Sequence, residues 1–176
     1  MGGVKFAAVD WGDSKVADFA SYWHGLYQDT TLPFQSDFDP AKVMHLLPGI
    51  AIYELHDSGK IMCRLMGTAL AEVFGWDYTD QNFLNIWAAD QREAVLRIFR
   101  QIVQQPCALL TDIYGITSTG LEIDGRSVNF PVRDADGQAT RLICYTYATQ
   151  QHTTRDPRHD RVVELRTRNM CIVDLN

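Results

Sequence analysis

The chemically versatile side chains of this chain lie close together in one stretch, CRLMGTALAEVFGWDYTDQNFLNIW, between residues 63 and 87. Arg64 alternates there with apolar neighbours, and a guanidinium can hold an anionic ligand through two parallel hydrogen bonds, although a surface salt bridge is the more common role. Aromatic side chains offer large apolar area, with a polar group on tryptophan and tyrosine. Packing in the core is the alternative role for the aromatic residues. The candidate ligand contacts are Arg64, Trp76, Tyr78, Phe83 and Trp87.

Signatures of catalysis are missing from the sequence. It contains no G-x-S-x-G, no H-E-x-x-H and no phosphate-binding glycine loop, which would supply a nucleophile, a metal pair or a phosphate cradle. We therefore expect that the protein is not an enzyme. The alternative is a small α+β enzyme that uses the same pocket, with Asp77, Asp112 or His56 as an acid or base.

Composition limits the classes of partner. A chain of 176 residues with 46% hydrophobic residues can bury one continuous core. Its net charge of -6 disfavours nucleic acid as a partner, because binding to phosphates needs a positive field. No apolar run approaches the length of a membrane span, so we expect no membrane association and a cytoplasmic protein. Four cysteines without a C-x-x-C pair indicate reduced, mostly buried thiols.

The elements that must position these residues follow from periodicity and turn signals. Residues 14–28 repeat apolar side chains at three- and four-residue steps, which predicts an amphipathic helix. Asp39-Pro40 begins a second helical segment that ends at Pro48-Gly49. Two β-branched and aromatic runs, 50–55 and 61–66, enclose the turn HDSGK and predict a hairpin. A short helix then begins near Thr68 and ends at Gly75.

The second half of the chain supplies a long helix and three more strands. Residues 90–105 carry apolar side chains at helical spacing, with Pro106 as the stop. Strands are expected near 107–117, 121–132 and 138–149, the last two joined by the turn DADG. These elements can form one five-stranded antiparallel sheet with helices on one face, an α+β fold preceded by the amphipathic helix. A pocket between the sheet, the long helix and the aromatic loop is then possible.

The composition changes near residue 150. Together with the helices and strands expected above, this change divides the chain into four parts. We expect an N-terminal arm (1–13), a helical flank (14–48), a core (49–150) and an Arg-rich tail (151–176). The tail's five arginines are interleaved with acids, which predicts a solvated helix or arm. A nucleic-acid-associated regulator that uses this tail is a further alternative.

Several motifs together resemble the PAS superfamily, in particular a branch of single-domain PAS proteins common in alphaproteobacteria. In that branch the second strand reads Arg-aliphatic-x-Gly-Thr and the short helix ends in Gly, positions that Arg64, Gly67, Thr68 and Gly75 occupy. The resemblance covers about residues 14–150. Its segments are LP (32–33), DFDP (37–40), LLPGIAIYEL (46–55), CRLMGTALAEVFGWDYTDQNF (63–83) and FPVRDADGQATRLICYTYA (130–148).

The resemblance implies a stand-alone PAS-like sensory or adaptor protein that acts through protein contacts, with small-ligand binding as an option. PAS sensors that form a flavin adduct carry a reactive cysteine before the long helix, and residues 76–89 contain none, so a covalent flavin adduct is disfavoured. PAS domains that bind haem commonly use a histidine on or beside the long helix, and 89–105 has none, so haem is not favoured. The cofactor remains unknown.

The amphipathic N-terminal helix is a candidate contact surface between two copies of the chain. Phe19, Trp23 and Tyr27 exceed what a small core needs, and aromatic residues are enriched at protein interfaces. Packing of this helix on its own sheet is the alternative. The expected partners are therefore a second copy, in a homodimer, and signalling proteins.

Overall fold

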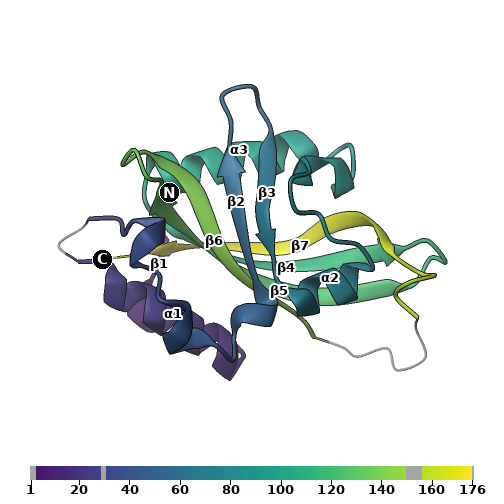
Figure 1. The fold of residues 1–176 in the computed structure, drawn as a ribbon, viewed down its shortest axis with the longest axis horizontal. Coiled ribbons are helices and arrows are strands. Elements are labelled where there is room, and N and C mark those ends of the chain that lie inside the picture. The colour runs from purple at the N-terminus through teal and green to yellow at the C-terminus, as the bar shows by residue number, and fades with distance from the viewer. Residues whose placement is uncertain (1–2, 29–30, 150–155, 176) are drawn as a thin grey trace.

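One seven-stranded sheet forms the centre of the molecule (Figure 1). The computed structural model describes residues 3–28, 31–149 and 156–175. The sheet order is β1-β7-β4-β5-β6-β2-β3, and every neighbouring pair is antiparallel except the parallel pair β1–β7. The strands are β1 (Val4–Lys5), β2 (Ile50–Leu55), β3 (Ile61–Met66), β4 (Ala108–Thr117), β5 (Glu122–Arg133), β6 (Ala139–Ala148) and β7 (Val162–Asp174).

The predicted α+β class is confirmed, and the predicted strand count is corrected from five to seven. The five expected strands are β2 to β6, which are contiguous in the sheet. The two additional strands, β7 and β1, extend the sheet beyond β4.

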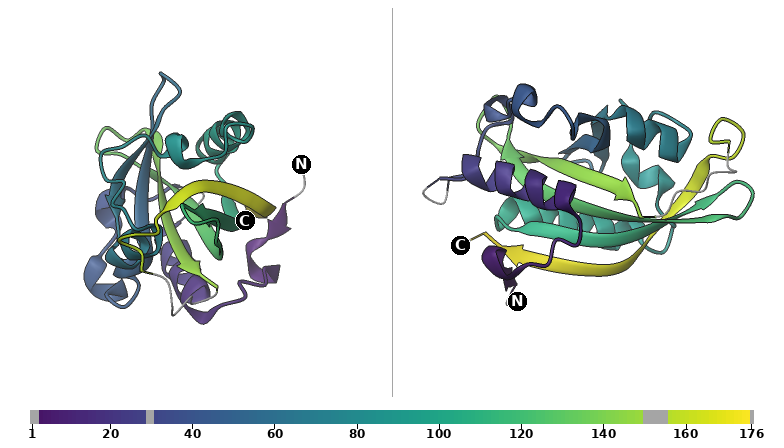
Figure 2. Two further views of the ribbon diagram at one scale, coloured as in Figure 1. Left: turned by 90° about the vertical axis from the view of Figure 1, so that its right-hand side faces the viewer. Right: turned by 90° about the horizontal axis from the view of Figure 1, so that it is seen from below.

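Helices cover the two faces of the sheet unequally, as the two views of Figure 2 show. The helix α1 packs on one face, and α2 and α3 pack on the other with the short helix η5. Within the described residues, none of the helices has the length and hydrophobicity needed to cross a bilayer. The α-helices are α1 (Ser14–Leu26), α2 (Thr68–Phe74) and α3 (Arg92–Gln104), and the 3-10 helices are η1 (Phe6–Ala8), η2 (Gln35–Asp37), η3 (Pro40–Val43), η4 (Leu47–Gly49) and η5 (Phe83–Ile86).

Alternating side chains of the strands separate two cores. On β6, Leu142 and Cys144 face the core beneath α2 and α3, whereas Ile143 and Tyr145 face the core beneath α1. This period of two follows from the pleat of an extended strand. A side chain on β6 therefore belongs to one core or the other according to whether its residue number is even or odd.

Gly67 connects β3 to α2 at a point where the backbone is crowded. Its N–H donates to the carbonyl of Ile50 at 2.8 Å. A Cβ at this position would overlap the carbonyl oxygens of Leu47 and Pro48. The short helix then ends at Gly75, which has a left-handed φ of 72° that favours glycine. The chain thus leaves the sheet where the sequence predicts it should.

The expectation that the C-terminal segment is a solvated helix or arm is wrong for residues 162–174. They form β7, which pairs antiparallel with β4 along that whole strand. Arg166 contacts Glu164 and Asp90, and Arg168 contacts Glu122 and Asp124, all within 3.3 Å. These acidic partners weaken the positive field that the nucleic-acid alternative requires.

Phe19 and Trp23, two of the three residues expected to form a dimer surface, are instead buried inside their own chain. Phe19 and Trp23 have no exposed area, and the Trp23 ring stacks on Phe130 of β5 with 4.5 Å between centroids. Tyr27 is half-buried and stacks on Trp23 at 5.4 Å. The aromatic face of α1 therefore fills the core of its own chain. This burial removes the apolar area of the face from water, as burial in a dimer would also have done.

Candidate ligand-binding site

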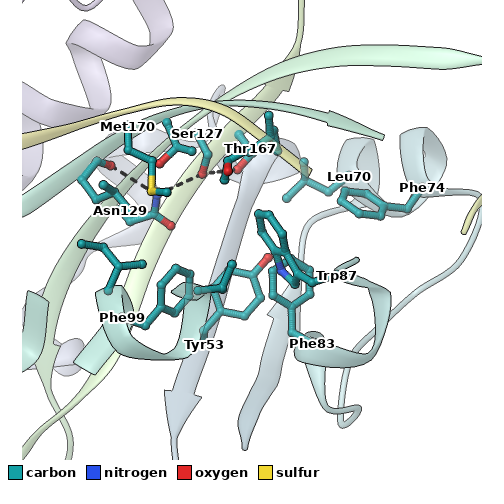
Figure 3. Close-up of a pocket in the computed structure, with 16 residues that line it drawn as sticks. Tyr53, Leu70, Phe74, Phe83, Trp87, Phe99, Ser127, Asn129, Thr167 and Met170 are labelled. Carbon is teal, nitrogen blue, oxygen red and sulfur yellow. Dashed lines mark hydrogen bonds between the residues drawn. The ribbon is translucent and has the colours of Figure 1, made fainter. Parts of the chain in front are cut away.

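A cavity lies between one face of the sheet and the helices α2, η5 and α3 that cover it (Figure 3). Its volume of about 30 Å³ is room for about two water molecules. Five aromatic rings form much of its wall, and Tyr53 stacks on Phe83 with 4.4 Å between centroids. The aromatic lining residues are Tyr53, Phe74, Phe83, Trp87 and Phe99.

The sheet side of the cavity carries polar side chains beside apolar ones such as Leu109 and Ile113. The strand register places Thr111 beside Ser127, and Ser127 beside Thr146, so that three hydroxyl groups form a row across β4, β5 and β6. Thr146 donates a hydrogen bond to the Ser127 hydroxyl at 2.8 Å, and the Asn129 amide donates to the same hydroxyl at 3.3 Å. Thr167 of β7 also lines the cavity on this side. The site therefore joins an aromatic wall to a hydrogen-bonding floor.

Two polar atoms on residues that line the cavity have no hydrogen-bond partner among the described residues. They are the indole Nε1 of Trp87 and the hydroxyl Oγ1 of Thr111, and both atoms are fully buried. Trp87 is 5% exposed and Thr111 is 4% exposed. A buried donor without a partner costs free energy, so a guest that reached either group would gain a hydrogen bond that the folded chain lacks.

All the side chains that line the cavity are uncharged. Moving an ion from water into such a site would cost several kcal/mol, because no opposite charge compensates for its lost hydration. The chemistry of this lining therefore favours a neutral guest.

Two of the predicted ligand contacts line this cavity and three do not. Phe83 and Trp87 belong to its aromatic wall. Tyr78 packs edge-on against Phe74 and is separate from the lining. Trp76 is 49% exposed and follows Gly75, the residue that caps α2. Arg64 lies outside the cavity on β3, in the salt bridge that the sequence favoured.

Arg64 pairs with Glu54 of β2, which is also bound by Arg141, and it lies 3.5 Å from Asp80. Arg64 Nε lies 3.0 Å from Glu54 Oε2, and Arg141 Nη2 lies 2.8 Å from the same oxygen. The hydrogen bond from Arg64, together with the charge of Arg141, lowers the pKa of the Glu54 carboxyl below its ordinary value. Arg64 thus joins β2 and β3 on the surface.

This pKa shift gives a testable pH dependence. Because the folded pKa of Glu54 is below the unfolded value of about 4.3, the ion pair stabilises the fold above that pH and is lost as pH falls through the lowered pKa. Glu54→Gln is expected to flatten the fall of unfolding free energy between about pH 5 and pH 3. Urea unfolding at several pH values measures this. The exposed Glu72→Gln is the control, and an equal slope in both variants would contradict the assignment.

Sequence reasoning missed the polar floor. Ser127 and Asn129 alternate with buried Val128 and Phe130, a pattern that normally marks a solvent-facing side of a strand. In the structure that side faces the cavity beneath α3. The burial of Thr111 likewise depends on β7, whose strand pairing the sequence did not predict.

The proposed acid or base residues lie away from the cavity. Asp77 is exposed, and hydrogen bonds from Thr79 lower the pKa of its carboxyl. Asp112 lies on the opposite face of β4, where a hydrogen bond from Arg126 lowers the pKa of its carboxyl. His56 contacts Glu54 at 3.2 Å. None of the three lines the cavity.

The cysteines are unpaired, as predicted, and Cys63 and Cys144 are fully buried. Burial raises the pKa of the Cys63 thiol to about 12, so this thiol stays protonated near neutral pH. Among the residues that the structure describes, no group of three or more His, Cys, Asp or Glu side chains is placed to hold a metal ion.

The contiguous antiparallel strands β4-β5-β6-β2-β3, with short helices and the long helix α3 on one face, form the α+β arrangement that the resemblance to PAS domains implies. A family model described as PAS domain matches residues 13–146. The chain belongs to the PAS domain family.

Solved structures similar to this chain include two light-oxygen-voltage proteins and a VqmA protein. A light-oxygen-voltage domain studied with a flavin analogue is 11% identical, with a TM-score of 0.48 over 64% of this chain and 87% of that one. The LOV protein of Rhodobacter sphaeroides is 8% identical, with a TM-score of 0.46 over 61% and 62%. VqmA bound to DPO is 13% identical, with a TM-score of 0.47 over 63% and 57%. Comparison with curated proteins gives no match.

Proposed function

We propose that this PAS domain is a sensor that binds a small neutral molecule in the cavity between its sheet and α3. The observation that carries the proposal is the pair of buried, unpartnered groups, Trp87 Nε1 and Thr111 Oγ1, in the lining of one cavity. A guest with a hydrogen-bond acceptor would satisfy the indole N–H, and the aromatic rings would take its apolar part. The predicted anionic ligand of Arg64 is not part of this proposal.

The proposed role does not include catalysis. In support, the three acid or base candidates lie outside the cavity, and its lining has no ionisable group other than the phenol of Tyr53. Burial raises the pKa of that phenol well above its ordinary value, so it stays protonated near neutral pH. A general acid or base works best with a pKa near the working pH, and this lining lacks such a group.

Signalling through protein contacts, including contact with a second copy of the chain, completes the proposal. The surface carries isolated apolar side chains that such contacts could use, since Met44, Leu65 and Trp76 are 68%, 42% and 49% exposed. A ligand would act by binding two conformations of the domain with unequal affinity. Native mass measurement with and without ligand tests whether association changes.

A matched series of probes tests the chemistry of the site. Acetophenone has an aromatic ring and a carbonyl acceptor, ethylbenzene has the shape without the acceptor, and benzoate adds a charge. Acetophenone is expected to bind about fivefold more tightly than ethylbenzene, the value of one net hydrogen bond, and benzoate is expected not to bind. Calorimetric titration of the full chain measures the three affinities.

Trp87→Phe provides the matched variant, because it keeps an aromatic ring and removes the N–H. It is expected to abolish the preference for acetophenone over ethylbenzene, whereas Trp76→Phe, at an exposed ring outside the cavity, leaves the preference intact. Failure of all three probes to bind, or preference for benzoate, would overturn the proposed function.

A further inference from the structure

The segment before α3 is hydrogen-bonded to the C-terminal strand. The Ala88 N–H donates to the carbonyl of Leu165 at 3.0 Å, and the Thr167 N–H donates to the side-chain oxygen Oε1 of Gln91 at 2.9 Å. Arg166 adds an ion pair to Asp90 at 3.3 Å. We call this contact between residues 87–91 and 165–167 the latch.

The latch and the cavity share two residues, one from each of the two segments that form the latch. Trp87 and Thr167 belong to the latch and also line the cavity. The Trp87 carbonyl accepts a hydrogen bond from Arg92 Nε at 2.9 Å, which ties the segment to the first turn of α3. A shift of the Trp87 ring therefore acts on the backbone that holds β7.

The size of the cavity makes such a shift necessary for a ring-shaped guest. The cavity measures about 30 Å³, and a cavity that takes benzene measures about 150 Å³. One wall must move when such a guest binds, because protein interiors are close-packed.

The cavity wall that includes the latch is held more weakly than the wall formed by the central strands β5 and β6. The strands β5 and β6 are each paired along both edges, and α1 covers their other face. The strand β7 is paired along one edge with β4. On its other edge, within the described residues, it is held by the two residues of β1 and by the latch.

We propose that occupancy of the cavity opens the latch, so that β7 is the element that reports ligand binding to the rest of the protein. This inference rests on the proposed function, because it assigns a response to the same site. Opening exchanges the hydrogen bonds of Ala88 and Gln91 to β7 for the contacts that the guest makes with the cavity.

Thermodynamic linkage makes the proposal testable in two directions. If binding opens the latch, removing a latch contact must strengthen binding by the factor by which it eases opening. Gln91→Ala is expected to bind acetophenone about fivefold more tightly than the unchanged protein, a factor that corresponds to one net hydrogen bond. Gln104→Ala is the matched control, because Gln104 is an exposed residue at the other end of α3.

Hydrogen exchange measured by mass spectrometry on the full chain tests the reverse effect, which is the effect of the bound ligand on the latch. Acetophenone is expected to speed amide exchange in residues 165–172 of the unchanged protein and to leave exchange in β5 as it was. Without any probe, Gln91→Ala is expected to speed exchange in the same segment by about fivefold, and Gln104→Ala is expected to have no effect.

The results separate this inference from the function on which it rests. If acetophenone binds but Gln91→Ala and Gln104→Ala have equal affinities, or if acetophenone slows exchange in residues 165–172, the latch is wrong and the ligand site stands. Unchanged exchange of Gln91→Ala without probe also overturns the latch. If no probe binds to the unchanged protein, both proposals fail.

Discussion

Replacing Gly67 by alanine is expected to lower the free energy of unfolding by about 3 kcal/mol or more, because the added methyl group has no free space. The Cβ would overlap the carbonyl oxygens of Leu47 and Pro48, which are backbone atoms and cannot rotate away. The backbone angles of Gly67, φ −65° and ψ 154°, are open to alanine, so the cost is steric rather than conformational.

Urea unfolding of Gly67→Ala measures this cost, and Thr68→Ala serves as the neighbouring control. Thr68 is exposed at the first position of α2, so its loss is expected to cost less than about 1 kcal/mol. A Gly67→Ala variant as stable as the control would show that the β3–α2 connection can relax. The crowding would then not be a constraint on the fold.

Trp23→Ala is expected to lower the free energy of unfolding by about 3–5 kcal/mol, because it empties the centre of the core beneath α1. The Trp23 side chain is fully buried and stacks on Phe130. If Trp23 instead contributed to a dimer surface, its removal would change the mass of the assembly and leave the stability of the monomer nearly unchanged.

Two further variants test whether the loss of stability comes from the buried ring of Trp23 itself. Trp23→Phe keeps a ring against Phe130 and removes an indole N–H that has no partner among the described residues, so its cost is expected to be smaller. Tyr27→Ala removes a half-buried ring at the end of the same helix and is also expected to cost less than Trp23→Ala. Urea unfolding together with native mass measurement distinguishes a core role from an interface role.

Local patterns determined much of the fold without any tertiary information. The bounds of β2 and β3 coincide with the predicted 50–55 and 61–66, because their apolar runs are enclosed by turn residues and by Gly67. Helix α3 follows from apolar spacing, and α2 from the glycine that ends it. These signals are short in range, and the motifs that they form were enough to indicate the PAS family.

Amphipathic patterns left the choice of partner open. The spacing of Phe19 and Trp23 shows that one face of α1 must be buried, and it fits a second chain as well as the chain's own sheet. Only the packed structure shows that this face covers β5 and β6. For the same reason, the aromatic residues near α2 divided into two that line the cavity, Phe83 and Trp87, and two that do not, Trp76 and Tyr78.

The sequence alone determined the central strands and the α-helices, because each depends on residues that are neighbours in the chain, and the motifs within them indicated the family. Tertiary structure alone decided that residues 162–174 form a strand, since their many charges hide the alternation and the edge of β4 supplies the hydrogen bonds. It also decided the binding site. The Trp87 indole and the hydroxyl row of Thr111, Ser127 and Thr146 come together only when segments distant in the chain are packed, and no local pattern encodes that meeting.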